Sequence, residues 1–157
     1  MGLLLKSAGV GSTSPVGFSP FGCGVAPIVS RWRRRKGGRV PTSVLIVDDD
    51  PSFRAVAAEL LRAQGFVVSG FALDAREAVE GVRRGSPDAV LLDVNLVDVD
   101  GLELSARLAG EGGQQRILLT SSDPRAATDE LAQRCGAVGF LPKTALAPSD
   151  LRRYFEA

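Results

Sequence analysis

The sequence contains no histidine, only two cysteines and no long apolar run. Without histidine, the chain forms neither a Ser-His-Asp nor a Cys-His catalytic site, and it has no histidine from which to donate a phosphoryl group. Cys23 and Cys135 lie far apart, so they predict neither a disulfide framework nor a zinc site and fit a reducing, cytoplasmic location. No apolar run reaches the roughly 18 residues of a membrane-spanning helix, so we expect no membrane partner.

Acidic residues are missing from the beginning of the chain. No acidic residue precedes Asp48, whereas seven of the 19 basic residues do. The rest of the chain carries 12 basic residues against 18 acidic ones. Residues 1–42 are rich in glycine, proline and serine and show no hydrophobic periodicity, which predicts a disordered basic extension. Residues 43–157 are the predicted folded domain.

The basic run RWRRRKGGR at residues 31–39 leaves three interpretations open. The run contacts nucleic acid or an acidic membrane surface, or it is a solvated tail, or it is translated sequence upstream of the true start. An acidic domain beside the run opposes binding to nucleic acid, so we favour the other two interpretations.

From Val44 onward, short apolar runs alternate with segments of helical spacing. The predicted strands are residues 44–47, 66–71, 89–92, 117–119 and 138–141. Helical segments are expected around residues 51–61, 75–82, 101–109, 124–135 and 151–155. The first of them carries one apolar stripe, formed by Phe53, Val56, Ala57, Leu60 and Leu61. This alternation predicts an α/β fold in which helices cover both faces of a parallel sheet.

Capping residues agree with these boundaries. Two Asp-Pro pairs, at residues 50–51 and 123–124, each place a carboxylate before a proline and predict a helix start. Asp74 and Glu77 have the spacing of a capping box. Gly136 predicts the end of the helix that begins at residue 124.

Polar residues follow four of the predicted strands directly. The carboxyl ends of parallel strands meet at one edge of the sheet, where such folds bind their ligands. Neighbouring strands lie only about 4.8 Å apart, so side chains at these ends converge. We therefore expect one pocket formed by Asp48, Asp49, Asp50, Asp93, Thr120, Ser121 and Lys143.

Three consecutive carboxylates, Asp48, Asp49 and Asp50, repel one another. Asp50 is explained as a helix cap, but a cap needs only one carboxylate. A hard divalent cation relieves the repulsion, and Mg²⁺ is typically held by one or two carboxylates together with a phosphate. The pattern predicts a Mg²⁺ site that includes Asp93; the alternative is that these acids are simply solvated.

Lys143 is the single lysine of residues 43–157, which contain eleven arginines. A compact ammonium group on a flexible stem suits contact with a carboxylate or one phosphate oxygen. Lys143 is therefore a candidate for the same pocket, the alternative being that the lysine persists by chance.

Four motifs, in this order, resemble the receiver domain of two-component response regulators. They are VLIVDDD at 44–50, LLDVNLVDVDG at 91–101, ILLTSSD at 117–123 and GFLPK at 139–143. The resemblance extends over residues 43–157. It implies a flavodoxin-like fold, in which a doubly wound, five-stranded parallel sheet of strand order 2-1-3-4-5 lies between two helical layers.

The resemblance also implies a metal site and a phosphoryl acceptor. Asp93 matches the carboxylate that becomes an acyl phosphate, and it also contacts the metal. Asp49 matches the direct Mg²⁺ ligand, and Asp48 matches its partner, which acts through water. The backbone carbonyl of Asn95 matches the third protein ligand.

Further positions match residues that contact or respond to the phosphoryl group. Thr120 and Lys143 match the residues that bind its oxygens, and Phe140 matches the aromatic residue whose rotamer follows the threonine. Because Phe140 lacks a tyrosine hydroxyl, we expect a purely steric switch. Asn95 and Ser122 occupy positions with which family members tune dephosphorylation.

The expected function is that of a single-domain response regulator in a phosphorelay. A histidine kinase or histidine phosphotransfer protein would donate the phosphoryl group to Asp93 with Mg²⁺, and the modified domain would change a protein-binding face. The expected partners are this donor and a downstream protein, with no DNA-binding output domain and with a phosphorylation-dependent homodimer as an additional state. We expect no enzyme activity beyond self-catalysed phosphorylation and dephosphorylation.

Three alternatives stay open on the sequence alone. Asp48 and Asp50 have the D-x-D spacing of Mg²⁺-dependent aspartate-nucleophile phosphatases, although no cap insertion or second downstream acidic pair is present. A second alternative is a pseudoreceiver, which would bind partners without being phosphorylated. The presence of all the acidic residues of the site argues against this alternative. The basic extension could tether the domain to nucleic acid, in which case binding would depend strongly on salt.

Overall fold

The computed structural model describes residues 40–110 and 113–156. The extension predicted to be disordered, residues 1–42, lies outside the described residues except for its last three positions.

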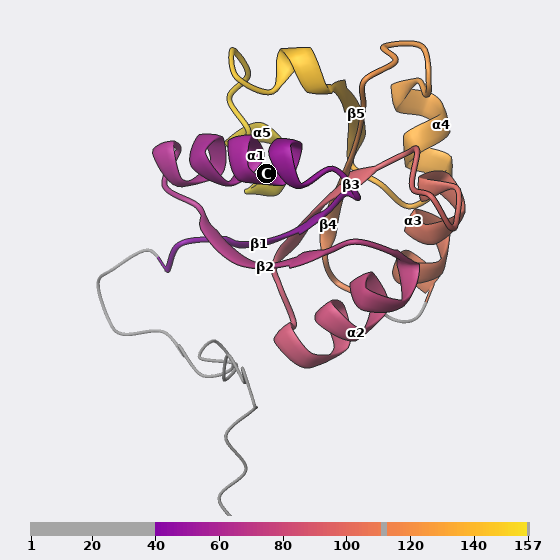
Figure 1. Cartoon of the computed structure of the whole chain (residues 1–157), viewed down its shortest axis with the longest axis horizontal. Coiled ribbons are helices and arrows are strands. Elements are labelled where there is room, and N and C mark those ends of the chain that lie inside the picture. The colour runs from indigo at the N-terminus through magenta and orange to yellow at the C-terminus, as the bar shows by residue number, and fades with distance from the viewer. Residues whose placement is uncertain (1–39, 111–112, 157) are drawn as a thin grey trace, which may run out of the picture.

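Five parallel strands form one sheet in the order β2-β1-β3-β4-β5 (Figure 1). The strands are β1 (Ser43–Val47), β2 (Val67–Ala72), β3 (Ala89–Asp93), β4 (Arg116–Ser121) and β5 (Gly139–Pro142). Each of them overlaps one predicted strand. The doubly wound, flavodoxin-like strand order is therefore confirmed.

Both faces of the sheet are covered by helices (Figure 1). On one face lie α1 (Pro51–Ala63) and α5 (Arg152–Phe155), and on the other lie α2 (Ala75–Gly85), α3 (Gly101–Gly110) and α4 (Asp129–Arg134). A short 3₁₀ helix, η1 (Lys143–Ala145), follows β5. This arrangement confirms the predicted three-layer α/β/α architecture. Among the described helices, none has the length and apolar content needed to cross a membrane.

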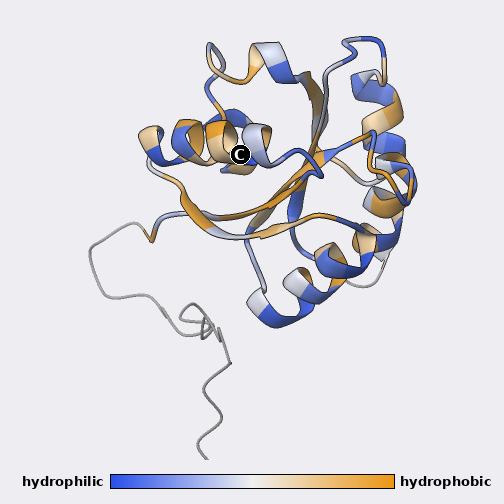
Figure 2. Ribbon diagram, viewed as in Figure 1, coloured by the Kyte–Doolittle hydropathy of each residue, from blue (hydrophilic) through white to orange (hydrophobic). Residues whose placement is uncertain are grey.

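The central strands are almost continuously apolar because both of their faces are buried. In β1, β3 and β4, Leu45, Val90 and Leu119 belong to the cluster under α2, α3 and α4. The alternate residues of the same strands, Val44, Leu91 and Leu118, belong to the cluster under α1 and α5. Figure 2 shows the same pattern, with hydrophobic residues along the strands and hydrophilic residues on the outer helix surfaces.

The first two predicted helix starts are confirmed. The Asp50 carboxylate accepts a hydrogen bond from the Ser52 N–H at 2.9 Å, and Pro51 is the first residue of α1. At α2, the Asp74 carboxylate accepts a hydrogen bond from the Glu77 N–H at 2.7 Å. The observed α3 also agrees with the predicted helix to within one residue.

The helix start predicted at Asp123 is wrong. The Asp123 carboxylate accepts a hydrogen bond from the Arg125 N–H at 2.9 Å, which closes a local turn, and Asp-Pro favours such turns as well as helix starts. The helix α4 begins only at Asp129 and is capped by the Thr128 hydroxyl. Its predicted end is confirmed, since Gly136 follows the helix with φ of 78° in the left-handed region.

The predicted apolar stripe of α1 is wrong at one position. Val56 is 56% exposed, whereas Ala57, Ala58 and Leu61 are buried. A helix turns once in about 3.6 residues, so the five residues of the predicted stripe spread over a wider arc than the buried face of α1. Val56 lies at the edge of this arc, where the side chain is exposed to solvent.

Gln64 holds the C-terminal segment against the end of α1. Its Nε2 donates to the Ser149 carbonyl at 2.9 Å, and its Oε1 accepts a hydrogen bond from the Leu151 N–H at 2.9 Å. The Gln64 carbonyl also accepts a hydrogen bond from Arg152 Nη2 at 2.9 Å. These contacts fix α5, which has only four residues and could not be stable by itself.

Candidate metal and phosphoryl site

Four strands bring the predicted site residues to one end of the sheet. Asp48 directly follows β1, Asp93 ends β3, Thr120 lies near the end of β4, and Lys143 directly follows β5. In the parallel register Asp93 lies beside Thr120. Four of the residues expected in the pocket, which are far apart in the sequence, therefore lie at one end of the sheet.

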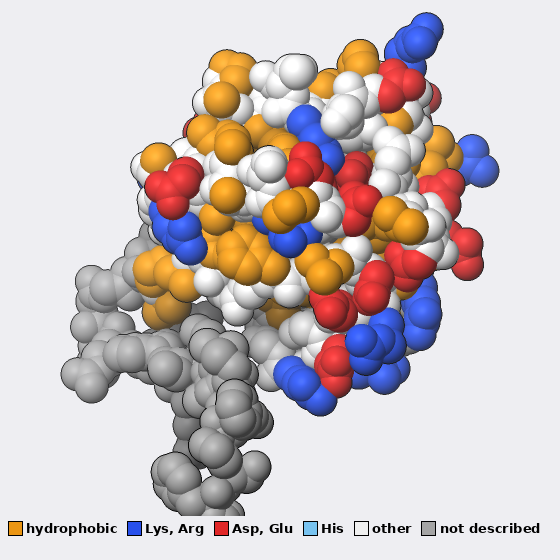
Figure 3. All heavy atoms as spheres, viewed as in Figure 1, with side chains coloured by type: hydrophobic (Ala, Val, Ile, Leu, Met, Phe, Trp, Pro, Cys, Tyr) orange, Lys and Arg blue, Asp and Glu red, His pale blue; other side chains and the backbone are white. Residues whose placement is uncertain are grey.

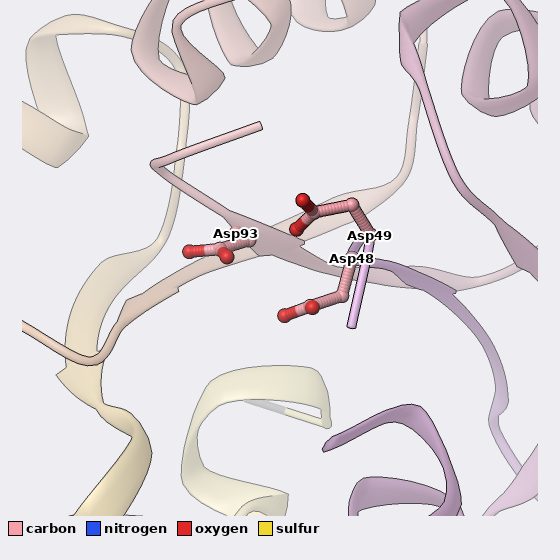
Figure 4. A group of neighbouring side chains, drawn as sticks. All are labelled: Asp48, Asp49 and Asp93. Atoms are coloured by element: carbon pink, nitrogen blue, oxygen red, sulfur yellow. The ribbon is translucent and has the colours of Figure 1, made fainter. Parts of the chain in front are cut away.

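Three carboxylates of this pocket lie close together. Asp48, Asp49 and Asp93 each offer an oxygen, and these atoms lie within 4.8 Å of one another. Figure 4 shows the three side chains around one space at the carboxyl ends of β1 and β3. Asp48 and Asp93 are buried, with 1% and 4% exposed, whereas Asp49 is exposed. Oxygen ligands at this spacing fit a hard divalent cation that enters from the side of Asp49.

The Lys143 ammonium partly neutralises the carboxylates. Its Nζ lies 2.6 Å from Asp48 Oδ2 and 2.9 Å from Asp93 Oδ2. Burial alone would lower the pKa of Lys143, but its hydrogen bonds to both carboxylates outweigh burial and raise this pKa, so the amine stays charged. Burial also raises the pKa of Asp48, and the hydrogen bond from Lys143 offsets this only in part. The cluster holds three carboxylates and Lys143 pairs with two of them, so the pocket carries excess negative charge.

The loop after β1 is fixed by its own hydrogen bonds. The Asp48 carboxylate accepts a hydrogen bond from the Asp50 N–H at 2.8 Å. The Asp48 carbonyl accepts a hydrogen bond from Arg54 Nη1 at 2.6 Å. Asp50 itself faces the start of α1 and is not one of the three clustered carboxylates. The helix-cap role predicted for Asp50 is thus confirmed.

The helix α3 packs tightly against the backbone of Asp93. The Gly101 N–H donates to the Val94 carbonyl at 2.8 Å, and the Asp93 carboxylate accepts a hydrogen bond from the Asn95 N–H at 3.2 Å. A Cβ atom at Gly101 would lie only 2.1 Å from the Asp93 carbonyl oxygen and 2.7 Å from the Val94 Cα. Glycine is therefore required at this position for α3 to approach the end of β3.

Asn95 is linked to β4 by its side chain. Its Nδ2 donates to the Ser121 hydroxyl at 2.7 Å, and Ser121 is fully buried. The Ser121 Oγ also accepts a hydrogen bond from the Asp123 N–H at 3.1 Å. Ser122, to which the sequence assigned a role in dephosphorylation, is the next residue and is exposed. Its role stays a prediction.

Thr120 carries a buried hydroxyl beside Asp93. The residue is 0% exposed, and its Oγ1 has no hydrogen-bond partner among the described residues. A buried polar group without a partner costs about 1–3 kcal/mol. An oxygen placed on the Asp93 carboxylate would supply the missing partner, so this hydroxyl fits a phosphoryl group at Asp93.

Phe140 lies on the other face of the sheet from the pocket. It is 8% exposed and lies beside Leu119 in the β4–β5 register, whereas Thr120 lies beside Leu141. The Phe140 N–H donates to the Asp129 carboxylate of α4 at 2.9 Å. Phe140 is thus coupled to α4, and the exchange of space with Thr120 stays a prediction.

Sequence reasoning missed two residues that contact the site. The sequence pattern places Phe53 in the apolar stripe of α1, but the Lys143 Nζ lies 4.2 Å from its ring centroid. Arg54 has no role in the sequence prediction, although its guanidinium donates to the Asp48 carbonyl. Their place in the first turn of α1, directly after the acidic run, was the available signal.

Comparisons with known proteins agree with this geometry. The sequence model of the response regulator receiver domain matches residues 44–156. PdtaR, a transcriptional regulatory protein of Mycobacterium tuberculosis, is 35% identical over 104 residues, which are 66% of this chain and 50% of PdtaR. Protein-glutamate methylesterase/protein-glutamine glutaminase 2 of Anaeromyxobacter dehalogenans is 34% identical over 119 residues, which are 75% of this chain and 34% of that protein.

A solved structure shows the same fold. The response regulator domain of Thermotoga maritima CheB aligns with a TM-score of 0.65 and 26% identity. The alignment covers 75% of this chain and 98% of that one.

The relatives correct the expected set of partners, which excluded a DNA-binding output domain. PdtaR is a transcriptional regulatory protein, and this chain spans about half the length of the curated relatives that it matches first. The expectation that excluded a DNA-binding output domain is therefore wrong. It relied on the length of the sequence, which says nothing about how relatives combine this domain with others.

The family match includes all five strands except for Ser43, the first residue of β1, and it includes the whole site. Asp48, Asp49, Asp93, Thr120 and Lys143 lie within residues 44–156. The strand order 2-1-3-4-5 and the likeness to the CheB response regulator domain agree with this match. The chain belongs to the response regulator receiver domain family of two-component signalling.

Proposed function

We propose that Asp93 accepts a phosphoryl group from a phosphohistidine of a histidine kinase or histidine phosphotransfer protein. An Asp93 oxygen attacks phosphorus, the bond between phosphorus and the donor nitrogen breaks, and its electron pair goes to that nitrogen. The sequence contains no histidine, so the donor group comes from a different sequence. The observation that carries the proposal is the position of Asp93 beside the Lys143 ammonium, at 2.9 Å, and beside Thr120, whose hydroxyl has no hydrogen-bond partner among the described residues.

The clustered carboxylates would hold the Mg²⁺ ion of the site. Asp48, Asp49 and Asp93 would supply carboxylate oxygens, and Asn95 its backbone carbonyl. Bound Mg²⁺ would neutralise phosphoryl oxygens and so reduce their repulsion from an attacking anion. The support is the spacing of the three oxygens, which lie within 4.8 Å of one another, and the exposure of Asp49 to solvent.

Lys143 and Thr120 would bind the transferred group. Lys143 carries a positive charge between Asp48 and Asp93, where it would balance charge that develops on the phosphoryl oxygens. Thr120 Oγ1 would donate the hydrogen bond that it lacks among the described residues. Phosphorylation adds roughly 1.5 to 2 negative charges, so both residues would be drawn towards Asp93.

The response would travel from Thr120 towards α4, β5 and α5. β4 pairs with β5, and Phe140 of β5 is hydrogen-bonded to Asp129 of α4. We infer that two packings of this face exist and that the phosphoryl group favours one of them, which a downstream protein recognises. The domain would catalyse its own phosphorylation and dephosphorylation, with Asn95 and Ser122 tuning the latter.

The D-x-D spacing that favoured a phosphatase does not place both of its carboxylates in the site. In a D-x-D motif both Asp48 and Asp50 would face the reacting group. Asp50 instead caps α1 through the Ser52 N–H and lies outside the carboxylate cluster.

The proposal is tested with the full chain, Mg²⁺ and acetyl phosphate, followed by intact mass. Here the P–O bond of the donor breaks and acetate leaves with the electron pair. The wild type gains the mass of one acid-stable, base-labile phosphoryl group, and Asp93→Asn gains none. Asp150→Asn is the matched control, because Asp150 caps a backbone N–H far from the site and an amide can do the same. Labelling of Asp93→Asn at the wild-type level would exclude Asp93 as the acceptor.

A further inference from the structure

Phe53 contacts the charged group of the site as well as the core. It is the third residue of α1, and its half-buried ring packs against the cluster under α1 and α5. The Lys143 Nζ lies 4.2 Å from the ring centroid. The Lys143 side chain is only 13% exposed, so little water competes for the ammonium. A cation over an aromatic face at this distance is attracted by the negative face of the ring.

The ammonium needs such a restraint because lysine has a long and flexible stem. Two contacts already hold it, at 2.6 Å from Asp48 and at 2.9 Å from Asp93. A phosphoryl group on Asp93 and a cation among the carboxylates would both change these contacts. The contact with Phe53 is different, because a neutral ring neither binds the metal nor carries a charge that the phosphorylation would repel.

The chemistry of the pocket also limits which side chain could serve here. A carboxylate at residue 53 would attract the ammonium, but it would join the excess negative charge of Asp48, Asp49 and Asp93 and compete with the phosphoryl group. An aliphatic side chain would fill the space without attracting the charge. An aromatic ring restrains the ammonium and adds no anion.

We propose that Phe53 is a positioning residue, whose ring holds the Lys143 ammonium where it meets the phosphoryl group that Asp93 receives. This inference rests on the proposed function. The ring acts through Lys143 and touches neither the acceptor nor the donor.

The decisive test weakens the negative potential of the ring face and keeps the shape of the ring. Phenylalanine carrying one, two or three fluorine atoms replaces Phe53 in the full chain, and the rate of Asp93 phosphorylation by acetyl phosphate is measured at fixed Mg²⁺. Fluorine withdraws electron density from the ring face, so the rate should fall stepwise, by about three- to tenfold over the series. A small donor removes any effect of Phe53 on docking of a donor protein. A flat series overturns the inference.

A second measurement detects the contact without metal or donor. The sequence has three lysines, Lys6, Lys36 and Lys143, so their side-chain signals are readily assigned by NMR. In metal-free wild type, the Cε protons of Lys143 should show an upfield ring-current shift that Phe53→Leu removes. Phe71→Leu is the matched control, because Phe71 is a half-exposed phenylalanine on β2. A Lys143 signal that coincides with those of Lys6 and Lys36 in the wild type overturns the inference.

The two proposals fail in different ways. If wild type is phosphorylated normally and the fluorinated series is flat, only the role of Phe53 is lost. If neither the wild type nor any variant gains a phosphoryl group, the proposed function fails and the role of Phe53 fails with it, whatever the lysine signal shows. Thermal unfolding is followed in parallel, and the fluorinated rings keep the test valid even if Phe53→Leu does not fold.

Discussion

At the scale of single residues, the pocket concentrates charge of one sign. Asp48, Asp49 and Asp93 lie within 4.8 Å of one another, and Lys143 is the ammonium that pairs with two of them. Figure 3 shows acidic side chains gathered near the strand ends, with basic side chains among them as well as over α2. Like charges at such distances destabilise the folded state.

Asp49→Asn should therefore stabilise the metal-free domain and weaken Mg²⁺ binding. Removing one of three mutually repelling carboxylates should raise the free energy of unfolding by about 1 kcal/mol. Thermal unfolding is measured with and without Mg²⁺, and the variant should lose most of the increase in Tm that Mg²⁺ gives the wild type.

Asp50→Asn is the control for this change, because asparagine caps a helix as well as aspartate does. It should keep the full response to Mg²⁺. An Asp49→Asn variant with an undiminished response would remove Asp49 from the metal ligands.

Gly101→Ala should disturb the acceptor through the backbone. The added Cβ would lie 2.1 Å from the Asp93 carbonyl oxygen, so α3 must move away from β3. We expect a loss of about 1–3 kcal/mol in the free energy of unfolding, together with slower phosphorylation of Asp93. Denaturant unfolding and acetyl phosphate labelling measure the two effects.

Gly110→Ala offers the matched control at the other end of α3. Among the described residues, no atom outside the helix's own backbone and the chain neighbours lies within 4 Å of a Cβ added there, and alanine favours the helix. It should be neutral or slightly stabilising. Equal free energies of unfolding for the two variants would mean that the close approach of Gly101 to Asp93 does not contribute to stability.

At the scale of helices and strands, the sequence predicts an element well where its signal is local. Asp50 and Asp74 were correctly identified as caps because the carboxylate and its N–H partner are neighbours in sequence. The Asp123 prediction failed because the same local signal also closes a turn, and only packing decides between the two. The structure places the start of α4 at Asp129, where the side chain reaches across to Phe140 of β5.

Asp129→Ala should release α4 from β5. The Phe140 N–H would lose its acceptor, and we expect a cost of about 1–2 kcal/mol to the local stability of this face. Amide hydrogen exchange at Phe140 reports the loss directly. Glu130→Ala, the neighbouring exposed acidic residue, is the control and should leave that amide protected.

Asp129→Asn tests the mechanism more finely. An amide oxygen still accepts the hydrogen bond, so protection of the Phe140 N–H should largely return. Unchanged exchange in Asp129→Ala would show that packing alone holds α4 against β5.

At the scale of the whole molecule, topology followed from the order of the motifs and from the family resemblance. The alternation of strands and helices predicts a parallel sheet, but it does not specify the strand order. Contacts between distant segments could not be predicted in the same way, because they depend on side-chain placement in the assembled fold. Examples are the contact of Phe53 with Lys143 and the hydrogen bond from Asn95 to Ser121. The exposure of Val56 depends in the same way on how α1 packs against the sheet.

Removing residues 1–39 should leave phosphorylation of Asp93 unchanged. Every residue of the site lies between Asp48 and Lys143, and described residues supply the contacts that hold the Lys143 ammonium beside Asp48 and Asp93. Acetyl phosphate labelling of residues 40–157 is compared with that of the full chain at low and at high salt. A loss of labelling at low salt alone would instead assign the basic extension a role in neutralising the pocket.

The pocket is formed by residues from separate strands, so a bound ligand is expected to protect the whole domain from unfolding and proteolysis. Asp48, Asp93 and Lys143 follow or end β1, β3 and β5. A ligand that contacts all three residues therefore has no binding site until these strands have assembled into the sheet. Such a ligand binds the native chain and not the unfolded one, and therefore stabilises the domain by RT ln(1 + [L]/Kd) as a whole. Local unfolding of strands remote from the pocket would then be rarer, and proteases would cleave the ligand-bound protein more slowly than the free protein.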